Sequence, residues 1–191
     1  MRQPSIQGNP GREYTEEIPM LVRSILIVPA LFFATAAFGQ GAAPSAHADI
    51  VNAQGQKIGT AQFAPSAGGV RIDIEVAQLP PGAHGVHIHT VGKCEGPDFK
   101  SAGGHLNPEM KQHGKDNPNG PHAGDLLNLT VGPNGKARES LLAAHATLDA
   151  GPNSLFHEGG TAIVIHEKED DYKTDPTGNS GGRIACGVVH R

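Results

Sequence analysis

Apolar and polar residues alternate along eight short segments of this chain, a pattern typical of β-strands with one buried face. The segments are residues 48–53, 57–64, 70–77, 85–90, 126–131, 137–144, 161–166 and 184–189. Turn-forming residues separate them, and Gly132-Pro133-Asn134-Gly135 is typical of a β-hairpin. We therefore predict an all-β fold, an eight-stranded antiparallel sandwich or flattened barrel.

Two longer stretches, residues 91–124 and 167–182, interrupt this rhythm of short strands. Loops of such length in a compact domain usually carry function. The chain has no Trp and only 4% aromatic residues, so the core must consist mainly of Val, Ile, Leu and Ala. We expect bound metals and a disulfide to supply part of the stability of so light a core.

The amino-terminal part has a different pattern. Residues 25–38 are almost wholly apolar, Arg23 precedes them and small residues follow, which is the layout of a secretory signal peptide. An uncleaved anchor is the alternative, but this apolar run is short for a membrane span. Cleavage after Ala36, Gly39 or Ala48 would each follow a pattern of small residues, and the sequence leaves all three open.

This layout divides the chain into four parts. Residues 1–19 form a doubtful leader that lies upstream of the true start if translation begins at Met20; the alternative is a genuine unstructured leader. Residues 20–39 are the predicted signal peptide, 40–47 a short linker and 48–191 the folded domain. We expect an exported protein, periplasmic or extracellular, with no stable membrane association after cleavage.

Removal of the leader leaves roughly 145 to 150 residues, enough for one domain with a single core. From residue 41 onward there are 12 Lys and Arg against 16 Asp and Glu, a net charge of −4 that argues against nucleic acid as a partner. The only two cysteines, Cys94 and Cys186, both lie in this part. In an exported chain such a pair suggests a disulfide, with two free thiols as the alternative.

Six of the eleven histidines fall in a series with the spacing of metal ligands. His87 and His89 are two apart on a predicted strand, so they share a face, although alternating surface strands also produce such pairs by chance. A segment crowded with Gly, Pro and Asn follows, and its three histidines and one aspartate suit a tetrahedral zinc site. The full series is His87, His89, His105, His113, His122, Asp125 and His166.

Five ordered motifs between about residues 48 and 189 resemble those of the copper/zinc superoxide dismutases. The motifs are Gly85-Val86-His87-Ile88-His89, Gly104-His105-Leu106-Asn107-Pro108, His122-Ala123-Gly124-Asp125-Leu126, His166-Glu167-Lys168 and Gly181-Gly182-Arg183-Ile184-Ala185-Cys186-Gly187-Val188. The resemblance implies an immunoglobulin-like Greek-key barrel that holds one copper and one zinc ion per subunit. It assigns copper to His87, His89, His105 and His166, and zinc to His105, His113, His122 and Asp125.

The activity that this resemblance implies is dismutation of superoxide to oxygen and hydrogen peroxide. Copper would cycle between Cu(II) and Cu(I), and His105 would bridge it to a structural zinc and carry a proton. Arg183 would dock the anion, unless it is an ordinary surface arginine. Asp170 would link His87 to His113, unless residues 167–171 are only a solvated charge run, and Thr177 would narrow the channel.

Other expectations concern the remaining histidines, the surface and the assembly. By the resemblance, Cys94 and Cys186 tie the loop after the copper strand to the last strand, and His84 braces a crossover. Four histidines match no ligand position, and we expect polar surface roles for them: His47, His145, His157 and His190.

The segment from Asp170 to Arg183 is short, which resembles the bacterial secreted branch, and a homodimer is possible. A positive rim that steers superoxide could come from Lys93, Lys100, Lys115 and Lys173.

Two other functions compete with the dismutase. One is an exported module of the same fold that binds or delivers copper without fast turnover. The other is a zinc-stabilised sandwich used for adhesion, which would leave His87, His89 and His166 without a role. All the ligands and Arg183 are present, and this complete set favours the enzyme.

Overall fold

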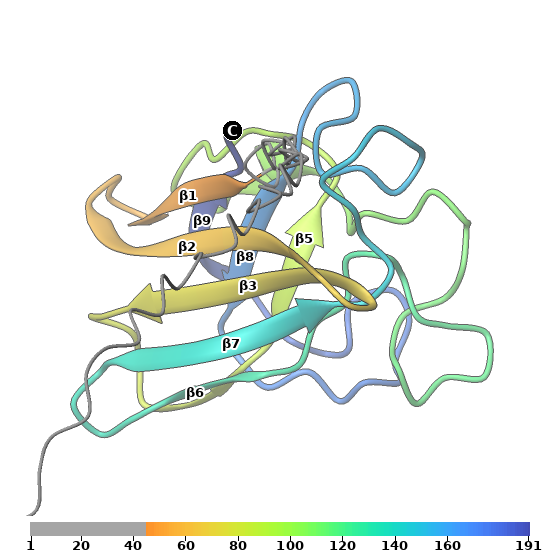
Figure 1. Ribbon diagram of the computed structural model, residues 1–191. Helices are drawn as coiled ribbons and strands as arrows, with labels where there is room; N and C mark the ends of the chain where they lie inside the picture. Colours follow the sequence, from red (N-terminus) through yellow and green to blue (C-terminus); the bar gives the residue numbers. More distant parts are fainter. Residues whose placement is uncertain (1–44) are drawn as a thin grey trace, which may run out of the picture. The chain divides into compact units, whose positions relative to one another are not determined.

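The computed structural model describes residues 45–191. The predicted leader, the signal peptide and most of the predicted linker therefore lie outside the described residues. Nine strands and one short 3-10 helix make up the described part (Figure 1). They are β1 (Ala46–Asn52), β2 (Lys57–Ser66), β3 (Gly69–Val76), β4 (Gly82–His84), β5 (Val86–His89), η1 (Lys100–Ala102), β6 (Leu129–Val131), β7 (Ala137–Ala143), β8 (Ala162–His166) and β9 (Arg183–Val188).

Seven of these strands form one antiparallel sheet in the order β5-β8-β9-β1-β2-β3-β7. Figure 1 shows β1, β2, β3 and β7 as one layer, with β9, β8 and β5 crossing behind it, so the sheet curls round a common core. The short antiparallel pair β4-β6 forms a second sheet, and β6 lies beside β7. The predicted all-β antiparallel fold is confirmed.

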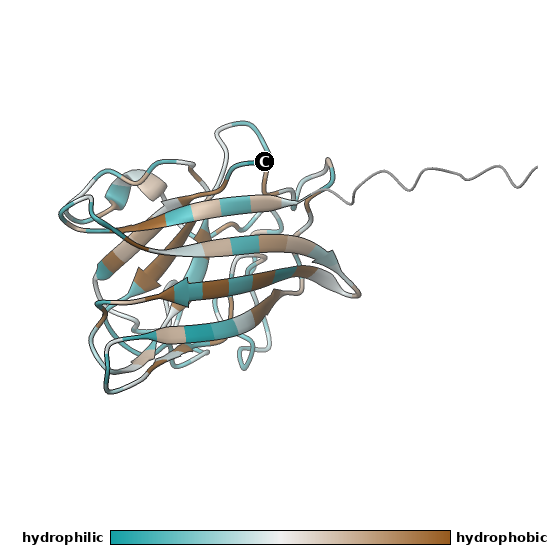
Figure 2. Cartoon of the chain, turned by 60° about the vertical axis from the view of Figure 1, so that its left-hand side comes forward, coloured by the Kyte–Doolittle hydropathy of each residue, from teal (hydrophilic) through white to brown (hydrophobic). Residues whose placement is uncertain are grey.

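Alternation in the sequence decides which face of each strand is buried. In β3, Ile72 and Ile74 are buried while Arg71 and Asp73, which precede them in turn, are exposed. Figure 2 shows the same alternation of hydrophobic and hydrophilic residues along the neighbouring strands. One face of this layer is therefore solvated and the other packs on the core.

The core consists mainly of aliphatic residues, as expected, and Phe63 is among its largest fully buried side chains. A smaller cluster of Phe99, Ala102, Ala162, Val164 and Cys186 packs separately. It joins the loop after β5 to β8 and β9, beside the disulfide. The loop after β5 therefore has an apolar anchor of its own.

The strand boundaries differ from the expected ones where the backbone bonds to the long loops. The predicted strand 85–90 is observed as β5, which begins only at Val86. Gly85 lies between β4 and β5, where its N–H donates to Lys168 O and its carbonyl accepts from His166 N, both at 2.8 Å. A Cβ there would lie only 2.9 Å from Ser180 Cβ. β1 begins at Ala46 and so includes two residues of the predicted linker. No helix within residues 45–191 has the length and apolar character needed to cross a membrane.

Candidate metal centre

Strand β5 brings the first group of histidines together. His87 and His89 lie on β5, which pairs with β8 and so with the strand that ends at His166. On the other side of β5, His89 forms a bridge with His105. The four rings, which we call the four-histidine cluster, are buried, and each offers a nitrogen within 4.8 Å of the others.

One nitrogen of each ring in this cluster has no partner. Among residues 45–191, the buried side-chain nitrogen and oxygen atoms without a hydrogen bond are His87 Nδ1, His89 Nε2, His105 Nε2, His166 Nε2 and His157 Nε2. Four of them thus belong to the four-histidine cluster and only one lies elsewhere. Leaving a buried polar atom unpaired costs free energy, so their convergence indicates a site for a bound cation.

The second nitrogen of each ring determines which nitrogen keeps a lone pair. His89 Nδ1 donates to Gly103 O at 2.9 Å, and His166 Nδ1 donates to Gly181 O at 3.3 Å, because a carbonyl can only accept. His87 Nε2 donates to Asp170 Oδ2 at 2.7 Å. The unpartnered nitrogens of these three rings therefore present lone pairs, the form in which imidazole binds a metal.

A second group gathers round one carboxylate oxygen. Asp125 Oδ1 lies 2.9 Å from His105 Nδ1, 3.0 Å from His113 Nδ1 and 3.2 Å from His122 Nδ1. His105 Nδ1 and His122 Nδ1 are 3.3 Å apart. Tetrahedral zinc with bonds of 2.0–2.1 Å places its ligand atoms about 3.3 Å apart. The four distances given for this group, the Asp125 cluster, are therefore close to those of a zinc site. The set containing Asp125 whose ligand atoms all lie within 4.8 Å of one another is His87, His105, His113 and Asp125, so His122 lies farther from part of the group.

His105 belongs to both clusters. Its Nδ1 lies in the Asp125 cluster, while its Nε2 is one of the unpartnered atoms of the four-histidine cluster. The rings of His87 and His105 are only 4.0 Å apart between centroids. The imidazole of His105 is thus placed to join two metal ions.

Asp170 hydrogen-bonds to one histidine of each cluster. It is 1% exposed, and its two carboxylate oxygens accept from His87 Nε2 at 2.7 Å and His113 Nε2 at 3.0 Å. Asn128 brackets its backbone, donating from Nδ2 to Asp170 O and accepting Asp170 N–H at Oδ1, both at 2.9 Å. An outer carboxylate of this kind fixes the orientation of ligand rings.

The protonation states of the metal-free site suit metal binding. Burial lowers the pKa of His105 and of His166 to about 3, so both rings are neutral at pH 7. Burial alone would raise the pKa of Asp125, but hydrogen bonds from the three histidines outweigh it and hold that pKa far below its usual range.

His113 is the exception. Burial opposes its charge, but hydrogen bonds to Asp125 and Asp170 raise its pKa to about 9. A metal ion in the Asp125 cluster must therefore displace a proton from His113 at neutral pH.

Comparison with known proteins agrees with this geometry. The sequence profile described as copper/zinc superoxide dismutase (SODC) matches residues 57–189. The chain belongs to the copper/zinc superoxide dismutase family. It is 56% identical over 145 residues to "Superoxide dismutase [Cu-Zn] 1" of Aquifex aeolicus, covering 75% of this chain and 86% of that one. A second Aquifex aeolicus relative, "Superoxide dismutase [Cu-Zn] 2", is 47% identical and covers 86% and 96% of the two chains.

Solved structures match as well. The crystal structure of a double mutant of an SOD-like protein from Bacillus subtilis superimposes with a TM-score of 0.73 at 44% identity. The match covers 74% of this chain and 95% of that one. The fold and the family are therefore shown by independent comparisons of sequence and structure.

Arg183 lies beside the four-histidine cluster. Its Nη1 donates to Phe99 O and its Nη2 to Gly103 O, both at 2.7 Å. Gly103 O also accepts from His89 Nδ1, so one carbonyl positions both a ring of the cluster and the guanidinium. Burial lowers the pKa of Arg183 while Asp98 raises it, but guanidinium stays charged at any physiological pH.

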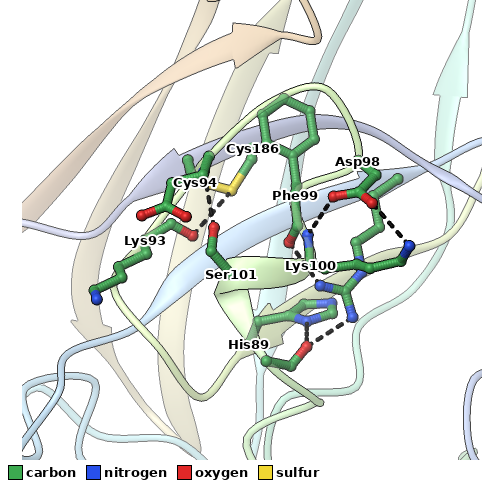
Figure 3. The surroundings of a disulfide bond; sticks show 11 residues. His89, Lys93, Cys94, Asp98, Phe99, Lys100, Ser101 and Cys186 are labelled. Atoms are coloured by element: carbon green, nitrogen blue, oxygen red, sulfur yellow. Dashed lines mark hydrogen bonds and ion pairs between the residues drawn. A yellow bond between two sulfur atoms is a disulfide. The ribbon is translucent and has the colours of Figure 1, made fainter.

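The expected disulfide is present and anchors the same loop. Cys94 and Cys186 are joined, with their Cα atoms 5.6 Å apart and a separation of 92 positions in sequence. Figure 3 shows Phe99 and Lys100 near the bond, in the loop that supplies carbonyls to Arg183. The bond attaches this loop to β9, the strand in which Arg183 is the first residue.

Other predicted residues are less closely involved. Thr177 is exposed, and the residue next to it, Gly178, packs so closely that a Cβ would overlap Asp170 Oδ1. His84 braces the crossover as expected, with its ring nitrogens 2.8 Å from His166 O and from Pro80 O. Of the four lysines expected at a positive rim, Lys100 is paired with Asp98, and Lys115 with Asp116.

Tyr172 is a site residue that sequence reasoning did not find. Its N–H donates to Asp170 Oδ1 at 2.7 Å, its hydroxyl accepts from Asn128 N at 2.8 Å, and its carbonyl accepts from Asp116 N at 3.0 Å. Lys115 Nζ lies 4.4 Å from the centre of its ring. No sequence signal distinguishes this residue, because two of these contacts use the backbone.

Proposed function

We propose that this protein converts two superoxide anions and two protons to oxygen and hydrogen peroxide at the paired clusters. The observation that carries the proposal is His105, whose two nitrogens face the two clusters. We assign copper to the four-histidine cluster and zinc to the Asp125 cluster. Four imidazole nitrogens suit Cu(II), whereas three nitrogens and one hard carboxylate suit tetrahedral Zn(II).

Copper, when bound, supplies the one-electron redox couple that the reaction needs. The protein would supply the positioning and the proton. Arg183 has five N–H donors, of which two bond to Phe99 O and Gly103 O. The remaining donors can hold a superoxide anion beside the four-histidine cluster. His105 Nε2 is the atom that would carry a proton to the substrate, while Nδ1 stays in the Asp125 cluster.

Several of the remaining residues would support these roles. Asp170 would orient His87 and His113, and the exposed Thr177 would border the approach to the site. Lys93 and Lys173, for which the structure shows no ion pair in residues 45–191, are the better candidates among the four lysines for attracting an anion.

We also propose that the domain works outside the cytoplasm. A disulfide persists in oxidising compartments such as the periplasm or the extracellular space, and residues 20–39 would serve as the signal peptide. After cleavage the domain 48–191, together with part of the linker, would have no stable membrane association. A homodimer is the assembly to be tested by sedimentation.

The competing function is an exported module that binds or delivers copper. Metal-free protein should be loaded with copper and zinc, analysed for metal content, and tested both for superoxide removal and for copper transfer to a chelator. We expect one copper and one zinc per chain, slow transfer, and superoxide removal that needs copper. Full loading with rapid transfer and no superoxide removal would support the delivery module instead.

A further inference from the structure

A third histidine group lies outside the paired clusters, on the solvent face where β1 meets the end of the chain. His47 in β1 and His190 just after β9 are directly opposite each other in an antiparallel bridge. Each donates its backbone N–H to the carbonyl of the other, both at 2.8 Å. Residues opposed in this way project their side chains from the same face of the sheet.

The two imidazoles are exposed and share a hollow. Their ring centroids are 6.0 Å apart. Ring pairs within the two metal clusters are separated by 4.0 to 6.4 Å, so this spacing lies in the same range. Both rings line a surface hollow of about 260 Å³, together with Asp49 and the disulfide. Within residues 45–191, neither ring makes a side-chain hydrogen bond that would occupy its nitrogens.

Asp49 adds a carboxylate to the same face. It lies two residues after His47 in β1 and is exposed in the same way. Its only ion pair within residues 45–191 is with Lys57, 2.7 Å away, and both side chains are more than half exposed. A pair so exposed contributes little free energy, so Asp49 can turn toward a cation in the hollow.

We propose that His47 and His190, with Asp49 as an additional oxygen ligand, form a second, exchangeable binding site for a divalent transition metal. Two imidazoles and a carboxylate suit copper(II) and zinc(II), and copper(II) binds nitrogen and oxygen ligands the more tightly. The antiparallel bridge fixes the backbone of both histidines before the ion arrives, so only side chains must be ordered on binding. Their ligand atoms, with those of Asp49, do not already lie within 4.8 Å of one another, so the three side chains must turn toward the ion. Exposure to water makes this site weaker than the buried clusters.

The test is a copper(II) titration of the protein after both buried clusters have been filled, followed by calorimetry and by electron paramagnetic resonance. The mass of the purified protein must first show that His47 is retained. We expect one further copper(II) per chain, with a signal distinct from that of the buried copper. His47→Ala and His190→Ala should each weaken this binding by about tenfold or more, because a single imidazole cannot chelate.

His145→Ala is the matched control, since His145 is also an exposed histidine and lies outside this hollow. It should leave the additional copper(II) in place, and all three variants should remove superoxide as the unaltered protein does. The proposal is overturned if the filled protein takes up no further copper(II). It is equally overturned if the two alanine variants bind copper(II) as tightly as the unaltered protein, or if the control loses binding to the same extent.

Discussion

Each ring of the four-histidine cluster is oriented by its other nitrogen. A backbone carbonyl holds His89, another holds His166, and Asp170 holds His87. Asp125 holds His105, which also belongs to the Asp125 cluster. The HxH pattern predicted that His87 and His89 share a face, and the family resemblance predicted which other residues join them. The carbonyls of Gly103 and Gly181 could not be predicted, because any residue type supplies a backbone oxygen.

Arg183→Ala tests the docking role at the scale of one residue. We expect superoxide removal to slow on the order of tenfold or more, because the anion loses its fixed hydrogen-bond donors. Both metals should remain bound, since the guanidinium contacts backbone carbonyls and not a ligand ring. Kinetics and metal content of this variant should be measured beside Arg138→Ala, an exposed control. Unchanged kinetics would remove Arg183 from the mechanism.

Asp125→Ala tests the zinc assignment. Asp125 Oδ1 is the atom round which three histidines gather, and its Oδ2 accepts from Gly114 N at 2.9 Å. We expect zinc affinity to fall by more than the roughly 10–100-fold cost of losing an outer partner, with copper retained. Metal analysis during dialysis against a chelator measures this, and Asp116→Ala in the same loop is the control. Full zinc occupancy in the Asp125 variant would refute the assignment.

Elements position these residues in two different ways. The strands formed where apolar and polar residues alternate, and the sheet that they form brings β5 beside β8. The loops 91–124 and 167–182 lack such a pattern. Side chains that bond to backbone hold them instead, as Asn128 does at Asp170 and Tyr172 does at Asn128. The sequence therefore predicted that these loops are functional, but it could not predict how they are held or that β6 begins only at Leu129.

Tyr172→Ala tests whether that residue fastens the two loops together. The substitution removes the hydroxyl that accepts from Asn128 N and the ring that lies under Lys115. Zinc should dissociate faster on transfer to a chelator, by up to about tenfold, because Asp170 and the Asp125 cluster lose a support. Tyr172→Phe keeps the ring and should show a smaller effect. Equal release from all three proteins would mean that the backbone contacts alone fasten the loops.

For the whole molecule, stability depends on the metals because its core is light and its site is rich in buried histidines. Ions that bind only the folded state stabilise it by a free energy that grows with the logarithm of the ion concentration relative to the dissociation constant. The low aromatic content indicated this dependence from the sequence. The curled sheet and the disulfide fix the framework, and the two loops complete the site on it.

The metal-free protein should be most stable near pH 6.5. The folded pKa of His105 and of His166 is about 3, against about 6.5 when unfolded. The unfolded chain therefore binds more protons between these values, and stability falls as the pH falls below 6.5. His113, with a folded pKa of about 9, acts in the opposite sense: its contribution is complete below 6.5 and is lost as the pH rises through 9.

Urea unfolding of the metal-free protein at pH 4.5, 6.5 and 9 measures this dependence. Asp125 and Asp170, whose pKa values are held low by the histidines, add a further loss at the acid end. A free energy of unfolding that stays constant from pH 4.5 to 6.5 would contradict the description of these rings as buried and neutral.

The most direct test of the central claim is the decay rate of superoxide, followed by pulse radiolysis, on protein with measured copper and zinc contents. We predict that decay accelerates in proportion to copper occupancy and that salt slows it, because a cationic Arg183 attracts the anion. Full copper occupancy with decay no faster than in buffer would contradict it.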